Sequence, residues 1–255
     1  MKTKYLLLTL FIISISVLSV CADSECEPIV GAWRLDRVYE NASSDNPVLL
    51  EPESAASLYA EAENIYFFEA DGSASETLTE AGEIIVRQDG ISWKKTDGLY
   101  QLMENDDISL ELTFDEKENA FHRYWNETAA DATYHDLDFV YVRVPVGSWK
   151  MTQVYSVNPG EEPKLLDPEN SASLYSESSN IYTLKADGTA EVLINGEFTQ
   201  NGEWNRNENV VSLVLEDGDN MELSFDPAAD LLHRYWNDED PDAAYHQLDF
   251  VYTRD

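Results

Sequence analysis

Cysteine is almost absent from this chain of 255 residues. The only two, Cys21 and Cys26, lie close together near the N-terminus. The sequence therefore excludes a disulfide framework of the kind that stabilises many small secreted domains. Packing of apolar side chains has to stabilise the fold instead.

Basic residues are also scarce, since 16 Lys and Arg stand against 50 Asp and Glu and give a net charge of -34. This charge repels phosphate backbones and excludes nucleic acid as a partner. It attracts cations and basic protein surfaces, so a protein partner for the acidic surface stays open. Disorder is not expected, because 43% of the residues are hydrophobic and 11% are aromatic.

Long apolar runs are missing except at residues 5–20, directly after the basic start MKTK. This pattern predicts an export signal at residues 1–22 and a tether at 23–28. Cys21 follows the run as the lipid-modified cysteine of a bacterial lipobox does, and such an anchor is the only membrane contact we expect. The alternative is ordinary cleavage after Ala22. The protein is then either anchored in the cell envelope or secreted.

Common catalytic motifs are absent as well. The chain has no G-x-S-x-G elbow, no P-loop and no HExxH, and its predicted domains contain no cysteine. We therefore expect no enzymatic activity and no cofactor. An isomerase or hydrolase built on His135 or His246 is the remaining enzymatic alternative.

A duplication organises the rest of the chain. The segment that begins at Gly31 matches the one that begins at Gly147, 116 residues on, and the spacing falls to 111 after the second copy loses five residues. HRYWN, for example, occurs at 122–126 and again at 233–237. A repeat of this length is a duplicated domain rather than a solenoid. We predict two touching domains, at 29–144 and 145–255.

The sequence of each copy predicts an all-β domain. Asp-Gly turn signals at 71–72, 89–90 and 97–98 separate short aromatic and β-branched runs, which is typical of antiparallel hairpins in a sandwich or barrel. One segment differs. At 53–63, and at its mate 169–179, Ala, Ser and Glu behind a proline predict a short helix or lid after the first strand.

Alternation of side chains predicts which residues face inward. In the first strand it places Trp33, Arg37 and Tyr39 on the inner face. In the last strand it turns Asp138 to solvent and Arg143 inward. An indole that opens each copy and a guanidinium that ends it can then stack as a cation-π pair.

The pairs Trp33 with Arg143 and Trp149 with Arg254 resemble the lipocalin signature, and the turn-rich units look like bacterial lipocalin-like domains. The resemblance implies two tandem antiparallel up-and-down calycin-type barrels of about eight strands each. It also implies that the Trp-Arg pairs are structural and close one end of each barrel. A ligand cavity would lie at the opposite end.

Such a cavity suits a small apolar or amphipathic molecule, so we predict a non-enzymatic binding protein. Its predicted lining is Arg37, Tyr39, Tyr66 and Tyr141 in the first copy, with the mates Gln153, Tyr155, Tyr182 and Tyr252 in the second. Large inner side chains favour a small or closed cavity. A filled barrel that acts as a protein-interaction module, either an inhibitor or an envelope component, is therefore the alternative function.

Metal binding is not predicted. All four histidines lie in the duplicated C-terminal hairpins, but the sequence leaves open whether they converge on one ion. The acidic loop at 237–242 offers oxygen ligands for Ca²⁺ without the order of residues found in an EF-hand.

Overall fold

Residues 27–80, 83–128, 132–157, 161–237 and 244–255 are described by this computed structural model. Every regular element in these ranges is a β-strand. The predicted export signal and Cys21 lie outside the described residues.

The first sheet contains ten strands. They are β1 (Gly31–Glu40), β2 (Val48–Leu49), β3 (Ile65–Phe68), β4 (Ala74–Glu80), β5 (Glu83–Arg87), β6 (Ile91–Thr96), β7 (Leu99–Glu104), β8 (Asp107–Asp115), β9 (Ala120–Asn126) and β10 (Asp136–Arg143). Their spatial order is β5-β4-β3-β1-β10-β9-β8-β7-β6, with β2 beside β1. A bridge joins Ser73, directly before β4, to Ser92 of β6, so the barrel is nearly closed while β5 stays at the edge.

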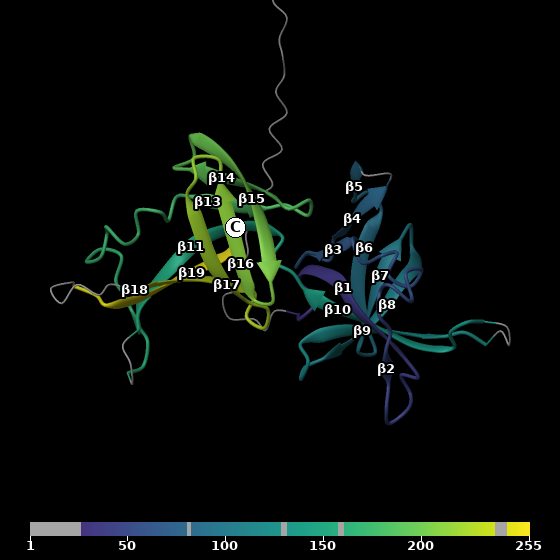
Figure 1. Cartoon of the computed structure of the whole chain (residues 1–255). Helices are drawn as coiled ribbons and strands as arrows, with labels where there is room; N and C mark the ends of the chain where they lie inside the picture. The colour runs from purple at the N-terminus through teal and green to yellow at the C-terminus, as the bar shows by residue number, and fades with distance from the viewer. Residues whose placement is uncertain (1–26, 81–82, 129–131, 158–160, 238–243) are drawn as a thin grey trace, which may run out of the picture.

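The second sheet contains β11 (Gly147–Ser156), β12 (Lys164–Leu165), β13 (Ile181–Leu184), β14 (Thr189–Ile194), β15 (Phe198–Asn207), β16 (Val210–Leu215), β17 (Asn220–Asp226), β18 (Leu231–Asn237) and β19 (Gln247–Arg254). Apart from the short β12, its eight strands form a closed antiparallel barrel, because β11 also pairs with β19. The two barrels lie side by side, the first purple to teal and the second green to yellow (Figure 1). This architecture confirms the predicted all-β fold with two antiparallel barrels.

The five-residue difference between the copies explains why only one barrel is fully closed. In the second copy β15 is a single strand that pairs with both β14 and β16. In the first copy the corresponding stretch is divided into β5 and β6 by a turn at Asp89 and Gly90, where Gly90 has a φ of 75°. Glycine adopts this left-handed conformation without steric cost.

A β-bulge in the first strand corrects the predicted inner face. The register between β1 and β10 shifts between Leu35 and Arg37. The extra residue turns the side chains that follow it to the opposite face. Val38 is consequently buried in the core, whereas Arg37 and Tyr39 lie on the outer face. Their predicted inward orientation is therefore wrong.

The second copy repeats this bulge, between Met151 and Gln153. Val154 is buried in the core, so Gln153 and Tyr155 also lie on the outer face, where the Tyr155 hydroxyl donates to the Gln153 side chain at 3.1 Å. Simple alternation fails in both copies for the same reason, because a bulge adds one residue to one strand of a pair.

The helix or lid predicted at 53–63 is not formed. The segment is a run of turns, and most of its backbone hydrogen bonds reach the carbonyl three residues earlier. The Tyr59 hydroxyl donates to the Leu50 carbonyl at 2.7 Å and accepts the Val38 N–H at 3.0 Å. These bonds tie the segment to the barrel, and so short a helix has little stability of its own. The mate 169–179 forms turns as well.

The closed end of each barrel is filled by packed rings. Phe121 is fully buried, and its ring centroid lies 4.6 Å from that of Trp33 and 5.0 Å from that of Phe114. In the second barrel Trp149 meets Phe225 edge to face at 6.1 Å. Such ring pairs stabilise a core by about 0.5–1.5 kcal/mol beyond the area that they bury.

An arginine lies over the tryptophan at this end of both barrels. The guanidinium carbon of Arg143 is 4.6 Å from the Trp33 ring centroid, and that of Arg254 is 4.5 Å from the Trp149 centroid. Arg143 also donates to the Val30 carbonyl at 2.6 Å. Gly31 has a φ of 129°, and a Cβ there would also lie only 2.6 Å from a nitrogen of Arg143, which together explain the glycine of Gly-X-Trp.

One carboxylate joins the two arginines across the barrel interface. Asp230 lies 3.4 Å from Arg143 of the first barrel and 2.6 Å from Arg254 of the second. Beside it, Val144 and Val146 of the linker belong to a buried apolar cluster that includes residues of both barrels. The corresponding position of the first copy is Asn119, so this acid belongs to the second copy alone.

Trp33→Ala is expected to lower the free energy of unfolding of the first barrel by roughly 3–5 kcal/mol, because it leaves a cavity in a packed core. Urea unfolding followed by near-ultraviolet circular dichroism measures this. Tyr124→Ala is the control, since that ring is 64% exposed, and its cost should stay below about 0.5 kcal/mol. Equal costs for the two variants would contradict a core position for Trp33.

Asp230→Asn should destabilise the contact between the barrels by about 1.5–3 kcal/mol, the usual range for a hydrogen bond to a charged group. Both guanidinium groups would lose their shared counter-charge. Differential scanning calorimetry should show the first barrel unfolding separately from the second. Asp226→Asn, an acid at the end of β17, is the control. A single unchanged transition for Asp230→Asn would rule out the proposed coupling.

Candidate functional site

Of the six tyrosines predicted to line the cavities, four lie inside the barrels, namely Tyr66, Tyr141, Tyr182 and Tyr252. Tyr66 and Tyr141 meet edge to face at 6.0 Å, and Tyr182 and Tyr252 do so at 5.5 Å. Burial raises the pKa of Tyr141 and of Tyr252 to about 12, so both hydroxyls are neutral at physiological pH. In each barrel the two rings therefore pack against one another as part of the core.

A groove of about 360 Å³ opens at the rim of the first barrel, between the turn segment and the β9–β10 hairpin. Its apolar lining consists of Leu58, Ala60, Trp125, Tyr134, Leu137 and Phe139. Its polar lining consists of Ser57, Glu61, Arg123, Glu127 and Thr133. Apolar walls with a few polar groups are what a site for a small molecule requires.

Arg123 and Glu61 are the central polar groups of this groove. The Arg123 guanidinium lies 5.5 Å from the Trp125 ring centroid and 5.4 Å from the Phe139 centroid. A nitrogen of Arg123 is 3.5 Å from a carboxylate oxygen of Glu61, which also accepts the Tyr66 hydroxyl at 3.4 Å. The groove is therefore connected to the buried tyrosines by hydrogen bonds.

The second barrel repeats most of the groove residues without change. The unchanged mates include Leu174, Glu177, Arg234, Trp236, Tyr245, Leu248 and Phe250. Arg234 lies 3.0 Å from Glu177 and 5.9 Å from the Phe250 centroid, and the Tyr182 hydroxyl donates to Glu177 at 3.3 Å. The arrangement around the arginine is thus duplicated. The adjacent residues 238–243 lie outside the described part of the chain.

The outer face of the same hairpin carries a histidine-aspartate pair in each copy. Nδ1 of His122 lies 2.8 Å from Asp138, and its ring stacks on Tyr124 at 6.0 Å. His233 and Asp249 repeat the pair at 2.9 Å. Asp138 is buried, so its predicted exposure to solvent is wrong. The hydrogen bond that the Asp138 carboxylate accepts from His122 raises the pKa of His122, although burial of the ring acts in the opposite direction.

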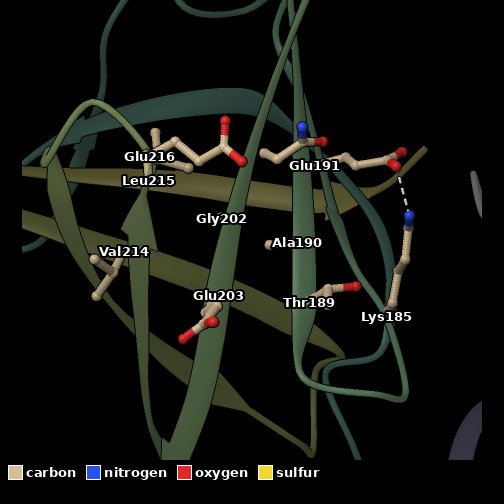
Figure 2. A pocket seen from close by; sticks show the side chains of 10 residues that line it. Lys185, Thr189, Ala190, Glu191, Gly202, Glu203, Val214, Leu215 and Glu216 are labelled. Carbon is tan, nitrogen blue, oxygen red and sulfur yellow. Dashed lines mark hydrogen bonds and ion pairs between the residues drawn. The ribbon is translucent and has the colours of Figure 1, made fainter.

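A second hollow, of about 530 Å³, lies over β14, β15 and β16 (Figure 2). Its lining includes Glu191, Glu203 and Glu216, and Lys185 forms an ion pair with Glu191. A Cβ at Gly202 would meet the neighbouring strand's carbonyl oxygen at 2.5 Å, so only glycine fits here. The acidic, open character of this hollow makes it a poorer site for an apolar molecule than the rim groove.

The sequence contained a signal for the groove. Within HRYWN, alternation places Arg123 and Trp125 on one face of β9 and His122 and Tyr124 on the other. We expected functional residues on the first and last strands and at Tyr66 and Tyr182 instead. The contribution of Glu61 was hidden for another reason, because the turn segment reaches the rim only through tertiary packing.

No protein-family model matches the chain, and no curated protein matches it in sequence. Among the described residues, no helix is long and apolar enough to cross a membrane. The structural class of the protein is therefore assigned from its fold alone. The chain is a tandem of two antiparallel β-barrels, each with an arginine on tryptophan at one end, and the lipocalin likeness remains a resemblance.

The His122–Asp138 pair predicts a pH-dependent stability. Because the pKa of His122 is raised in the folded state, the stabilisation is complete below the ordinary histidine pKa of about 6.5. It is lost as the pH rises through the raised value. His122→Asn should therefore cost about 1.5–3 kcal/mol at acidic pH and less at alkaline pH.

Urea unfolding at both pH values measures this difference. His135→Asn is the control, because that exposed ring bonds only to a backbone carbonyl in the described structure. A cost for His122→Asn that does not change with pH would show that folding does not raise the pKa of His122.

Proposed function

We propose that this chain is an exported, non-enzymatic binding protein that holds a small apolar or amphipathic molecule at the rim of each barrel. The observation that carries the proposal is the groove of about 360 Å³ with apolar and aromatic walls and a paired Arg123 and Glu61. The recurrence of these residues in the second barrel supports a duplicated binding role.

The rim is a better place for the ligand than the barrel interior. Tyr66 and Tyr141 are both buried, and each packs against the ring of the other. A ligand between them would have to separate packed rings, which costs the contacts of a dense core. At the rim, Trp125 is 46% exposed and its ring already forms part of an open groove. A ligand there buries apolar surface without opening the core.

Export follows in this proposal from the leader at residues 1–22, with a lipid anchor on Cys21 as one form and a secreted protein as the other. The lack of a recognisable catalytic motif in the sequence supports binding rather than catalysis. A lipocalin-like protein outside the cytoplasm would carry or sequester its ligand.

Titration with the neutral probe N-phenylnaphthylamine tests this function. The purified chain should bind two probes with a rise in probe fluorescence. Trp125→Ala should weaken one site roughly tenfold or more, equivalent to about 1.4 kcal/mol. Trp125→Ala combined with Trp236→Ala should weaken both. Tyr124→Ala, which removes an exposed ring from the outer face, should change nothing.

Loss of binding in Tyr124→Ala, or binding that survives in the double tryptophan variant, would place the probe elsewhere. Absence of any binding would argue against the small-molecule function.

A protein-interaction module is the second candidate, and β5 favours it. Ile84, Ile85 and Val86 are 42%, 39% and 61% exposed, on a strand at one end of the sheet order. Exposed apolar strands at a sheet edge can pair with another chain. Affinity capture with Ile85→Lys as the matched control separates this candidate from small-molecule binding. A partner retained equally by both proteins would argue against β5.

A further inference from the structure

We infer that the rim groove selects amphipathic organic cations over neutral and anionic molecules of the same shape. The inference rests on the proposed function and names the ligand class for that site. Its basis is the position of Glu61, which is the more exposed partner of the ion pair with Arg123 and lies beside the aromatic walls of the groove.

Arg123, which carries the positive charge of the groove, already forms an ion pair with a carboxylate of the protein. Arg123 lies 3.5 Å from Glu61 and is positioned between the rings of Trp125 and Phe139. Its side chain is only 22% exposed, whereas that of Glu61 is 45% exposed. An anionic ligand would have to displace Glu61 from a largely buried partner, which leaves charges without their counterparts. A cationic ligand can approach Glu61 while the ion pair stays intact.

The aromatic walls favour the same ligand class. The face of an indole or phenol ring is electron-rich and attracts ammonium groups, most strongly where water is excluded. Trp125 and Tyr134 both line the groove, and Trp125 is 46% exposed. The apolar side chains of Leu58 and Leu137 complete a surface for a hydrocarbon tail. A quaternary ammonium with an alkyl chain therefore finds a partner for each of its parts.

The charge of the whole chain acts in the same direction over a longer range. A net charge of -34 raises the local concentration of cations and lowers that of anions. This contribution falls as salt is added, because the Debye length shortens to about 8 Å at physiological ionic strength. The preference that originates within the groove should remain.

Isothermal titration of the full chain with three probes of equal chain length tests the inference. The probes are octyltrimethylammonium, octanol and octanoate, all below their critical micelle concentrations. We expect octyltrimethylammonium to bind at least tenfold more tightly than octanoate, with octanol between them. The order should persist at high salt, with a smaller difference.

Two variants locate the selectivity. Trp125→Ala should lower the affinity for octyltrimethylammonium roughly tenfold at one of the two sites. Glu61→Gln should lower that affinity about fivefold and raise the affinity for octanoate, because Arg123 then lacks its counter-charge. The matched controls are Tyr124→Ala for the ring and Glu63→Gln for the charge, since Glu63 is an exposed acid of the same turn segment. Both controls should bind like the unchanged chain.

The outcomes distinguish this inference from the proposed function. Octanol or octanoate that binds as tightly as the cation, and is lost with Trp125→Ala, would overturn the cation preference and leave the groove as the binding site. Cation binding that Glu63→Gln weakens as much as Glu61→Gln would show general charge attraction and also overturn it. Failure of all three probes to bind would overturn both.

Discussion

The stacking of a guanidinium on an indole at the closed end of each barrel is the contact on which the structure depends. It joins the first and last strands of a copy, and those strands are also hydrogen-bonded neighbours in the sheet. Arg143 and Arg254 then share Asp230, so the same groups that close the barrels also join them. An acid that only the second copy has thus forms ion pairs with both barrels, beside the apolar cluster that includes Val144 and Val146.

The proposed ligand site lies at the other end of the barrel, away from this closed end. The hairpin that recurs in both copies lies at this end, and its two faces have different roles. Arg123 and Trp125 face the groove, while His122 and Tyr124 form a polar, stacked cluster outside. One short motif therefore supplies both the rim of the site and part of the outer wall, which gives a physical reason for its occurrence in both copies.

Differences between the copies occur where the constraints are weak. Five extra residues divide one strand of the first barrel into β5 and β6, and Gly202 of the second copy stands where the first has Ile91. Glycine lets β15 approach β16 closely, and the second barrel closes fully because the undivided β15 pairs with both β14 and β16. Arg37 and Gln153 differ as well, but both lie on the outer face beyond a bulge and do not affect the interior.

The sequence alone determined the duplication, the all-β class and the residues that could form the Trp-Arg pairs, because these follow from local periodicity and from turn residues. Tertiary structure decided which side chains surround the groove. The bulge after Leu35 reverses which side chains of β1 face the core. No local sequence pattern in the strand predicts it, because a bulge depends on the pairing with the partner strand. The turn segment likewise became part of the rim because Tyr59 bonds to a distant backbone, and packing of that kind overrides the local preference for a helix.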